Sequence, residues 1–300
     1  MARPSTTTTE QRQQIIELKR RHSFTEVAAL LGLPVGTVKT IARRSGAFSD
    51  NPKHRELFTL PPLQGTTATS VAAVMLPEQR AVTGDKELDA VLWLRETIQS
   101  GNPALIDKAL AAAERIKTPP RELESRYAQY LLASTGNTLT AAFGSIGFAD
   151  LRELAERTRA KAINQAEAAA RFGDDPDMMT EADRFCVRVL KGVRAGRHGG
   201  IDDKDAAARF RQHPELVPHT LEDCLHELAF WHDLYRLRNA ATDWDGPEEA
   251  HAREHFTLSL LAEIRPRHKA EAKTVLRYLI DHDRKDTQRF DATLENLLSL

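Results

Sequence analysis

The fold of the N-terminal part is decided by the stretch SFTEVAALLGLPVGTVKTIARR, which spans residues 23–44. Ser23 and Glu26 have the spacing of a capping box, in which the serine oxygen accepts from a helical amide and the glutamate accepts from the serine amide. This pattern predicts that a short helix begins at Phe24. Because Gly32 readily adopts the left-handed backbone that ends a helix, the helix is expected to stop there.

A second helix is predicted directly after this turn. Pro34 suits the beginning of a helix, and the pattern predicts a helix from about Val35 to Arg44. Two helices joined by so short a turn must cross steeply, which requires a small residue where they touch, and Ala28 fits that position. An amphipathic helix over residues 10–21 is expected to close a three-helix core. The apolar positions assigned to this core are Ile15, Ile16, Leu18, Val27, Leu31, Leu33, Val38 and Ile41.

The cap, turn and core positions together resemble the helix-turn-helix of tri- and tetrahelical DNA-binding domains. Such domains occur in resolvase-type recombinases, in sigma factor region 4 and in many phage or plasmid regulators. The resemblance covers about Thr9 to Gly46, and it maps the small residue of the family to Ala28 and the turn glycine to Gly32. It implies that the second helix enters the major groove of double-stranded DNA. An ordinary helical hairpin is the alternative.

In this docking geometry, outward side chains near the start of the second helix meet base edges. Threonine methyls can touch thymine methyls, and Lys39 can reach guanine acceptors. Arg43 and Arg44 are expected to contact phosphates, as is Thr25 near the amide donors that begin the first helix. Arg3 would serve as a minor-groove arm unless the N-terminal tail is disordered. The residues expected at the bases are Val35, Gly36, Thr37, Lys39 and Thr40.

Charge is distributed unevenly along the chain. Residues 1–60 carry ten basic and five acidic side chains, so this part has a net charge of +5 within a chain whose total is −1. Phosphate attraction requires clustered positive charge, and a basic head on an acidic body favours a DNA-binding module joined to a second part. Chance clustering of charge is the alternative.

The rest of the chain is predicted to be all-α. Residues 58–76 hold no charge and are rich in Pro and Thr, which is typical of a linker, although Ser70 to Leu76 could instead form a short strand. Apolar residues then recur at helical spacing, including a long helix over 151–169 and a central helix over 221–240. The expected layout is a helix-turn-helix domain over 1–56, a linker over 57–84 and an all-helical oligomerisation or partner-binding domain over 85–300.

Residues 126–161 form a second helix-turn-helix candidate. The order of helix, Gly-Asn, paired alanines and Gly turn is similar to that of phage small terminases and Fis-like units. The turn is about one residue too long, however, and Asp150, Glu153 and Glu156 would repel phosphates. A structural helical hairpin is the alternative for this stretch.

The sequence contains no pattern typical of a catalytic or metal site. The two cysteines are too few for a disulfide framework or a four-cysteine zinc site, which favours the reducing cytoplasm. His226 and His232 are six residues apart and therefore do not share a helix face. No phosphate-binding loop, nucleophile constellation or window of about 20 apolar residues is present. We therefore expect no enzyme activity, no catalytic or metal-binding residue, no cofactor and no membrane span. The metal-ligand candidates considered were Cys186, His219, Cys224, His226 and His232.

These patterns favour a sequence-specific DNA-binding protein, as a transcriptional regulator of a phage, plasmid or other mobile element. The alternative is a DNA-recognition subunit of a packaging or segregation complex. Because one such module contacts few phosphates, a homo-oligomer or a second module is expected. The amphipathic tail over residues 290–298 is the candidate assembly surface, unless it only caps the bundle, and the C-terminal domain is the candidate site for a protein partner.

Overall fold

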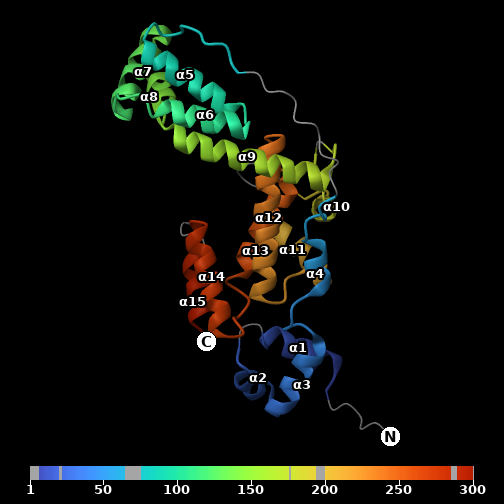
Figure 1. Ribbon diagram of the computed structural model, residues 1–300. Coiled ribbons are helices and arrows are strands. Elements are labelled where there is room, and N and C mark those ends of the chain that lie inside the picture. Colours follow the sequence, from blue (N-terminus) through green and yellow to red (C-terminus); the bar gives the residue numbers. More distant parts are fainter. Residues whose placement is uncertain are drawn as a thin grey trace. The chain divides into compact units, whose positions relative to one another are not determined.

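In the computed structural model, the regular secondary structure of the described residues is all helical (Figure 1). Within those residues it holds 15 α-helices, one short 3-10 helix and no strand. The all-α class expected from the sequence is therefore confirmed. The described residues are 7–19, 22–64, 76–175, 177–193, 200–284 and 289–299.

The chain divides into two compact units, and this division differs from the expected layout. Residues 57–84 were expected to link a head over 1–56 to a single domain over 85–300. Instead, α4 (Pro52–Leu57) packs against α12 (Leu221–Ala241), so the N-terminal segment belongs with the C-terminal helices. The first unit comprises residues 1–62 together with 174–300, and the second comprises residues 63–173.

The second unit is a bundle of five helices. Its first helix, α5 (Lys86–Gln99), packs against α6 (Pro103–Ala113), α7 (Pro120–Thr135) and α9 (Leu151–Phe172), while α8 (Thr138–Ser145) packs against α7. The long helix expected over 151–169 is confirmed as α9. The buried core of this unit consists of Leu88, Val91, Leu94, Ile98, Ile106, Ala109, Leu123, Phe148, Leu151, Leu154 and Ala155.

The expected linker is described only at its two ends. Residues 58–64 and 76–84 form neither helix nor strand, but Phe58 is fully buried and residues 58–62 belong to the first unit. Residues 65–75, which include most of the segment from Ser70 to Leu76, lie outside the described residues.

The body of the first unit is built around α12, whose apolar side chains are buried on several sides. This burial confirms the central helix expected over 221–240. Helix α12 packs against α4, α13 and α14, and α13 also contacts α10 and α11. The buried apolar residues of α12 are Leu221, Cys224, Leu228, Phe230, Trp231, Leu234, Leu237 and Ala240. The remaining elements of this body are α10 (Glu181–Leu190), α11 (Asp203–Phe210), the 3-10 helix η1 (Pro214–Leu216), α13 (Glu248–Leu260), α14 (Lys269–Asp281) and α15 (Phe290–Leu298).

Helix α4 is held on this body by both apolar and polar contacts. Phe58 is fully buried, and its ring centroid lies 5.7 Å from the rings of Phe230 and Trp231. The backbone N–H of Asn51 donates to Asp223 Oδ2 at 2.9 Å. These contacts explain why the chain up to Pro62 belongs to the first unit.

The C-terminal helix α15 uses much of its apolar stripe within its own chain. Leu297 is buried, and the side chain of Asn296 donates to the carbonyls of Leu261 and Ile264 at 2.8 and 2.7 Å. Leu298 remains 83% exposed. Helix α15 therefore caps the body, which was one of the two roles considered for this tail.

The N-terminal head of the first unit comprises α1 (Thr9–Lys19), α2 (Phe24–Leu31) and α3 (Val35–Ser45), which pack against one another. Residues 1–6, including Arg3, and residues 20–21 lie outside the described residues. No single helix in the described chain has the length and apolar character to cross a membrane; α2 and α3 pass that test only as a pair, which is bent by 113°.

Candidate nucleic-acid interface

Helix α2 begins and ends where the sequence predicts. The backbone N–H of Glu26 donates to Ser23 Oγ at 3.2 Å, and the N–H of Ser23 donates to Glu26 Oε2 at 2.6 Å, which confirms the capping box. The hydrogen bond from the Ser23 backbone lowers the pKa of the Glu26 carboxyl group. Gly32 ends the helix with a φ of 62°, in the left-handed region that favours glycine.

Helices α2 and α3 meet at 113° across the three-residue turn from Gly32 to Pro34. Ile15, Val27 and Val38 are fully buried where the three helices of the head meet, and Ala28 is 5% exposed. The expected core is confirmed, except that Ile16 is half-buried outside this cluster. Partly buried residues packed around the cluster are Leu18, Phe24, Leu31, Leu33, Val35 and Ile41.

The turn glycine offers a test of this local structure. A Cβ added to Gly32 or to Gly36 would meet no atom within 4 Å, so the two positions differ mainly in backbone conformation. Gly32→Ala is expected to destabilise the head by about 1 kcal/mol, because alanine disfavours a positive φ. Gly36→Ala, in helical backbone, is expected to stabilise it by about 0.5 kcal/mol. Hydrogen exchange of α2 and α3 amides in the full chain measures both effects, and equal effects would contradict this geometry.

The outer face of α3 carries polar and basic residues. Gly36, Lys39, Thr40 and Arg43 recur at intervals of three or four and are all exposed, as is Arg44. Among the described residues, no acidic side chain forms an ion pair with any of the three cations on this face. The positive charge of this face is therefore available to an external anion. We call Gly36, Lys39, Thr40, Arg43 and Arg44 the basic face of α3.

Two residues expected at base edges lie differently. Val35 is half-buried and packs against the core of the head, because it precedes Val38 by three positions and therefore shares its inner side. Thr37 is also half-buried. The hydroxyl of Thr40 donates to the carbonyl of Gly36 at 2.8 Å, so the part of Thr40 that can make a new contact without breaking this bond is its methyl group.

The remaining expected contacts lie at the ends of the helices. Thr25 is exposed at the second position of α2, where a helix N-terminus favours anions. Lys39 Nζ lies 5.9 Å from the ring centroid of Phe24, the first residue of α2. The start of α2 and the basic face of α3 are therefore neighbours in the head.

The second helix-turn-helix candidate, residues 126–161, folds into the end of α7, α8 and the first half of α9. Arg126 is held by Asp85 and Glu87 of the same unit, and α8 carries no charged residue. Asp150 accepts from the N–H of Glu153 at 2.9 Å and so caps α9. This part lacks the exposed unpaired cations of α3. It exposes apolar side chains that sequence reasoning did not single out, namely Leu139, Phe143 and Ile146.

The residues considered as metal ligands lie apart from one another. Cys186 and Cys224 are buried and form no disulfide, and burial raises the pKa of both thiols well above its usual value. His226 Nε2 contacts the carbonyl of Arg55 at 3.2 Å, while His232 packs edge-on against another imidazole. In the described part of the chain, no three His, Cys, Asp or Glu side chains are grouped so that they could hold a metal ion.

A buried charge network, which sequence reasoning missed, lies between α4, α12 and α13. Glu227 and Arg253 are fully buried and paired, with Arg253 Nε 2.7 Å from Glu227 Oε1. His54 Nε2 lies 2.6 Å from Glu227 Oε2, and Thr257 donates its hydroxyl to Oε1 at 2.7 Å. Burial raises the pKa of Glu227, but Arg253 and His54 outweigh it and hold the pKa at about 2. The network has no access to solvent, so we assign it to the stability of the body.

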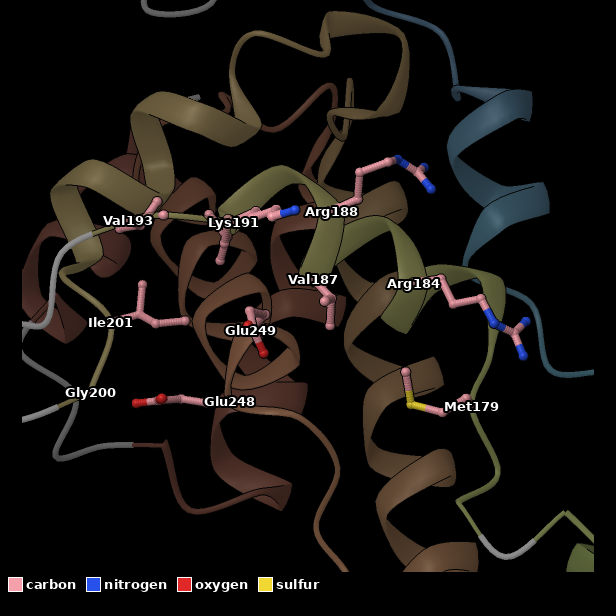
Figure 2. A pocket seen from close by; sticks show the side chains of 12 residues that line it. Met179, Arg184, Val187, Arg188, Lys191, Val193, Gly200, Ile201, Glu248 and Glu249 are labelled. Carbon is pink, nitrogen blue, oxygen red and sulfur yellow. The ribbon is translucent and has the colours of Figure 1, made fainter.

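An open hollow of about 810 Å³ lies between α10 and the start of α13. Figure 2 shows the side chains that line it. In this view the side chains of Arg184 and Arg188 extend away from Glu248, so the opposite charges do not converge on a common point. The residues that line the hollow include Val193 and Gly200, and residues 194–199 between them lie outside the described residues. We assign no ligand to this hollow.

Comparison with known proteins adds no relative. No family model, no curated protein and no solved structure matches the chain.

Proposed function

We propose that the protein binds double-stranded DNA through the basic face of α3 and acts as a sequence-specific transcriptional regulator. The observation that carries this proposal is the difference between the two sides of helix α3. Its inner side is buried in a three-helix core, and its outer side exposes Lys39, Arg43 and Arg44, for which no acidic partner lies among the described residues. A helix-turn-helix places its second helix in the major groove, with the two helices at about 90–120°, and the 113° between α2 and α3 suits that arrangement.

The distribution of roles along α3 follows from its position in a groove. Lys39 and Thr40 lie in the middle of the exposed stripe, where a side chain can reach a guanine acceptor or a thymine methyl. Arg43 and Arg44 lie in the last turn, where a helix in the major groove leaves the bases and meets the phosphates. Thr25, exposed at the start of α2, would contact a phosphate of the DNA backbone.

One head offers few phosphate contacts, and tight specific binding commonly requires two recognition helices one turn of DNA apart. The proposal therefore includes a second copy of the chain on the same site. A regulator of this kind should alter expression of a reporter whose promoter contains the selected site.

Arg44 provides a quantitative test of the phosphate role. Arg44→Ala is expected to weaken binding to all duplexes to a similar extent and to reduce the slope of log K against log salt by about one per head. Fluorescence anisotropy of the full chain on a labelled duplex, measured over a range of salt, gives both quantities.

The matched control is Arg277→Ala, which removes an exposed arginine of α14 and should leave the salt slope unchanged. An unchanged slope for Arg44→Ala would remove Arg44 from the interface. Absence of salt-dependent binding by the unaltered full chain would overturn the proposed function itself.

A further inference from the structure

A cavity of about 380 Å³ lies within the first unit, between the head and two loops of the body. The head contributes the end of α1 and the start of α2, and the body contributes residues 218–220 and 264–267. A volume of this size holds a small organic molecule of one or two rings. The side chains that give the cavity its chemistry are Lys19, Phe24, Phe48, His219, Arg265 and Arg267.

Two of the three cations in the cavity, Lys19 and Arg265, share a single carboxylate among the described residues. Burial and then the positive charge of Arg265 lower the pKa of Lys19, so the two cations oppose one another. Among the described residues, the acidic group near both is Glu26, whose Oε2 lies 3.8 Å from Arg265 Nη1. Glu26 is 58% exposed and accepts the N–H of Ser23, so one partly solvated carboxylate serves two cations. Arg265 also donates to the carbonyl of Ser299, which is neutral.

Arg267, on the same wall, differs from these two cations because it is paired with several carboxylates. Its guanidinium lies 3.0 Å from Asp50, 2.9 Å from Glu222 and 3.1 Å from Glu271. These three carboxylates satisfy Arg267 without any ligand. The surplus positive charge of the cavity is therefore located at Lys19 and Arg265.

Aromatic rings form the apolar part of the wall. Lys19 Nζ lies 4.7 Å from the ring centroid of Phe24 and 5.7 Å from that of Phe48. Both rings are half-buried, and each presents an apolar surface next to the surplus charge. A bare inorganic anion would neutralise the charge but would gain nothing from the apolar surface of these rings.

His219 adds an unpaired polar atom to the wall. Its Nε2 lies 3.4 Å from the side-chain nitrogen of Asn51, which already donates to the carbonyls of Glu215 and Val217 at 2.9 and 3.0 Å. Nδ1 is buried and has no hydrogen-bond partner among the described residues. A ligand oxygen in the cavity would give this nitrogen a partner in the tautomer that places the proton on it.

We propose that this cavity binds a small carboxylate on an apolar, aromatic body, with the carboxylate between Lys19 and Arg265 and the ring against Phe24 and Phe48. The assignment depends on the cavity alone and stands whether or not α3 binds DNA. Because the ligand would contact both the head and the body, it would couple the position of α2 to the body.

Isothermal titration of the full chain without DNA tests this site. The probe is 2-naphthoate, with 2-naphthalenemethanol as the neutral analogue of the same shape and sulfate as a charge without a ring. We expect saturable binding of 2-naphthoate and at least about tenfold weaker binding of the other two, because a charge-assisted hydrogen bond and aromatic packing are each required.

Variants then locate the bound molecule. Arg265→Gln and Lys19→Gln are each expected to weaken 2-naphthoate binding about tenfold or more. Arg277→Gln and Lys273→Gln remove exposed cations of α14 outside the cavity and should leave the affinity unchanged. The midpoint of thermal unfolding, measured without ligand, shows whether each variant is folded. If Arg265→Gln does not fold, Lys19→Gln alone provides the test.

Three results would overturn the assignment. One is the absence of saturable heat with 2-naphthoate up to millimolar concentration. Another is equal binding of the neutral analogue or of sulfate, which would indicate a nonspecific apolar or ionic contact. The third is affinity that both cavity variants leave intact, which would place the bound molecule elsewhere.

Discussion

Replacing Lys39 and Arg43 together by alanine is expected to abolish sequence-selective DNA binding and to leave the body folded. Both side chains are exposed on one face of α3, and neither forms an ion pair with an acidic side chain among the described residues. A base contact such as that of Lys39 commonly contributes about 1–3 kcal/mol, and Arg43 adds a phosphate contact, so the double variant should lower affinity for a selected site about 100-fold or more. Fluorescence anisotropy at fixed salt measures the loss, and far-ultraviolet circular dichroism reports the fold.

The matched control for this variant is Lys273→Ala with Arg277→Ala on α14. This double variant removes the same formal charge from exposed positions of another helix in the same unit. It should retain most of the affinity and all of the sequence preference. Equal losses for the two double variants would mean that overall charge, and not contact by α3, accounts for binding.

Glu227→Ala is expected to destabilise the first unit by about 3–5 kcal/mol. The change leaves the fully buried guanidinium of Arg253 without its carboxylate, and an unpaired buried charge is strongly unfavourable. Urea unfolding measures the loss through tryptophan fluorescence, best in a Trp93→Phe background, because Trp231 and Trp244 both belong to the first unit.

Acid provides an independent check on Glu227. Its pKa is about 2 in the folded protein and near 4.5 in the unfolded chain. A lowered folded pKa stabilises the protein above pH 4.5, and this contribution is lost as the pH falls from 4.5 toward 2. The difference in unfolding free energy between the wild-type protein and Glu227→Ala should therefore shrink across that range.

An exposed ion pair serves as the control for the buried one. Glu181 and Arg184 are 2.7 Å apart, but their side chains are 76% and 50% exposed. Glu181→Ala should change the unfolding free energy by no more than about 1 kcal/mol. A loss as small for Glu227→Ala would contradict the stabilising role of the buried network.

The head could be predicted from sequence because its signals are local. The capping box joins Ser23 to Glu26 across three residues, and the end of α2 depends on the backbone freedom of Gly32 alone. The spacing of apolar and polar positions at intervals of three or four residues also identified the inner and outer sides of α3. Val35 was assigned to the wrong side of this pattern, since a valine beginning a helix can face either way until the neighbouring helices are placed.

The attachment of α4 could not be predicted, because its partners are distant in the chain. Asn51 bonds to Asp223 across 172 residues, and Phe58 packs among aromatic side chains of α12. Nothing in the local sequence of α4, which is short and polar, indicates such a partner. The stretch after it therefore resembled the end of a domain.

The buried charges were missed for a related reason. Glu227 and Arg238 interrupt the apolar pattern of α12, and charged side chains normally lie at the surface. Their burial depends on Arg253 and Asp183, which reach them from other helices. The cavity beside Lys19 likewise exists only when the head and the loops of the body are placed together.

Selection of bound fragments from a random pool of duplex DNA by the full chain, compared with the Lys39→Ala, Arg43→Ala double variant, tests the central claim most directly. If the basic face of α3 reads DNA, the wild-type chain should enrich one sequence motif and the double variant should enrich none. Enrichment of the same motif by both proteins, or of no motif by the wild-type chain, would contradict recognition by α3.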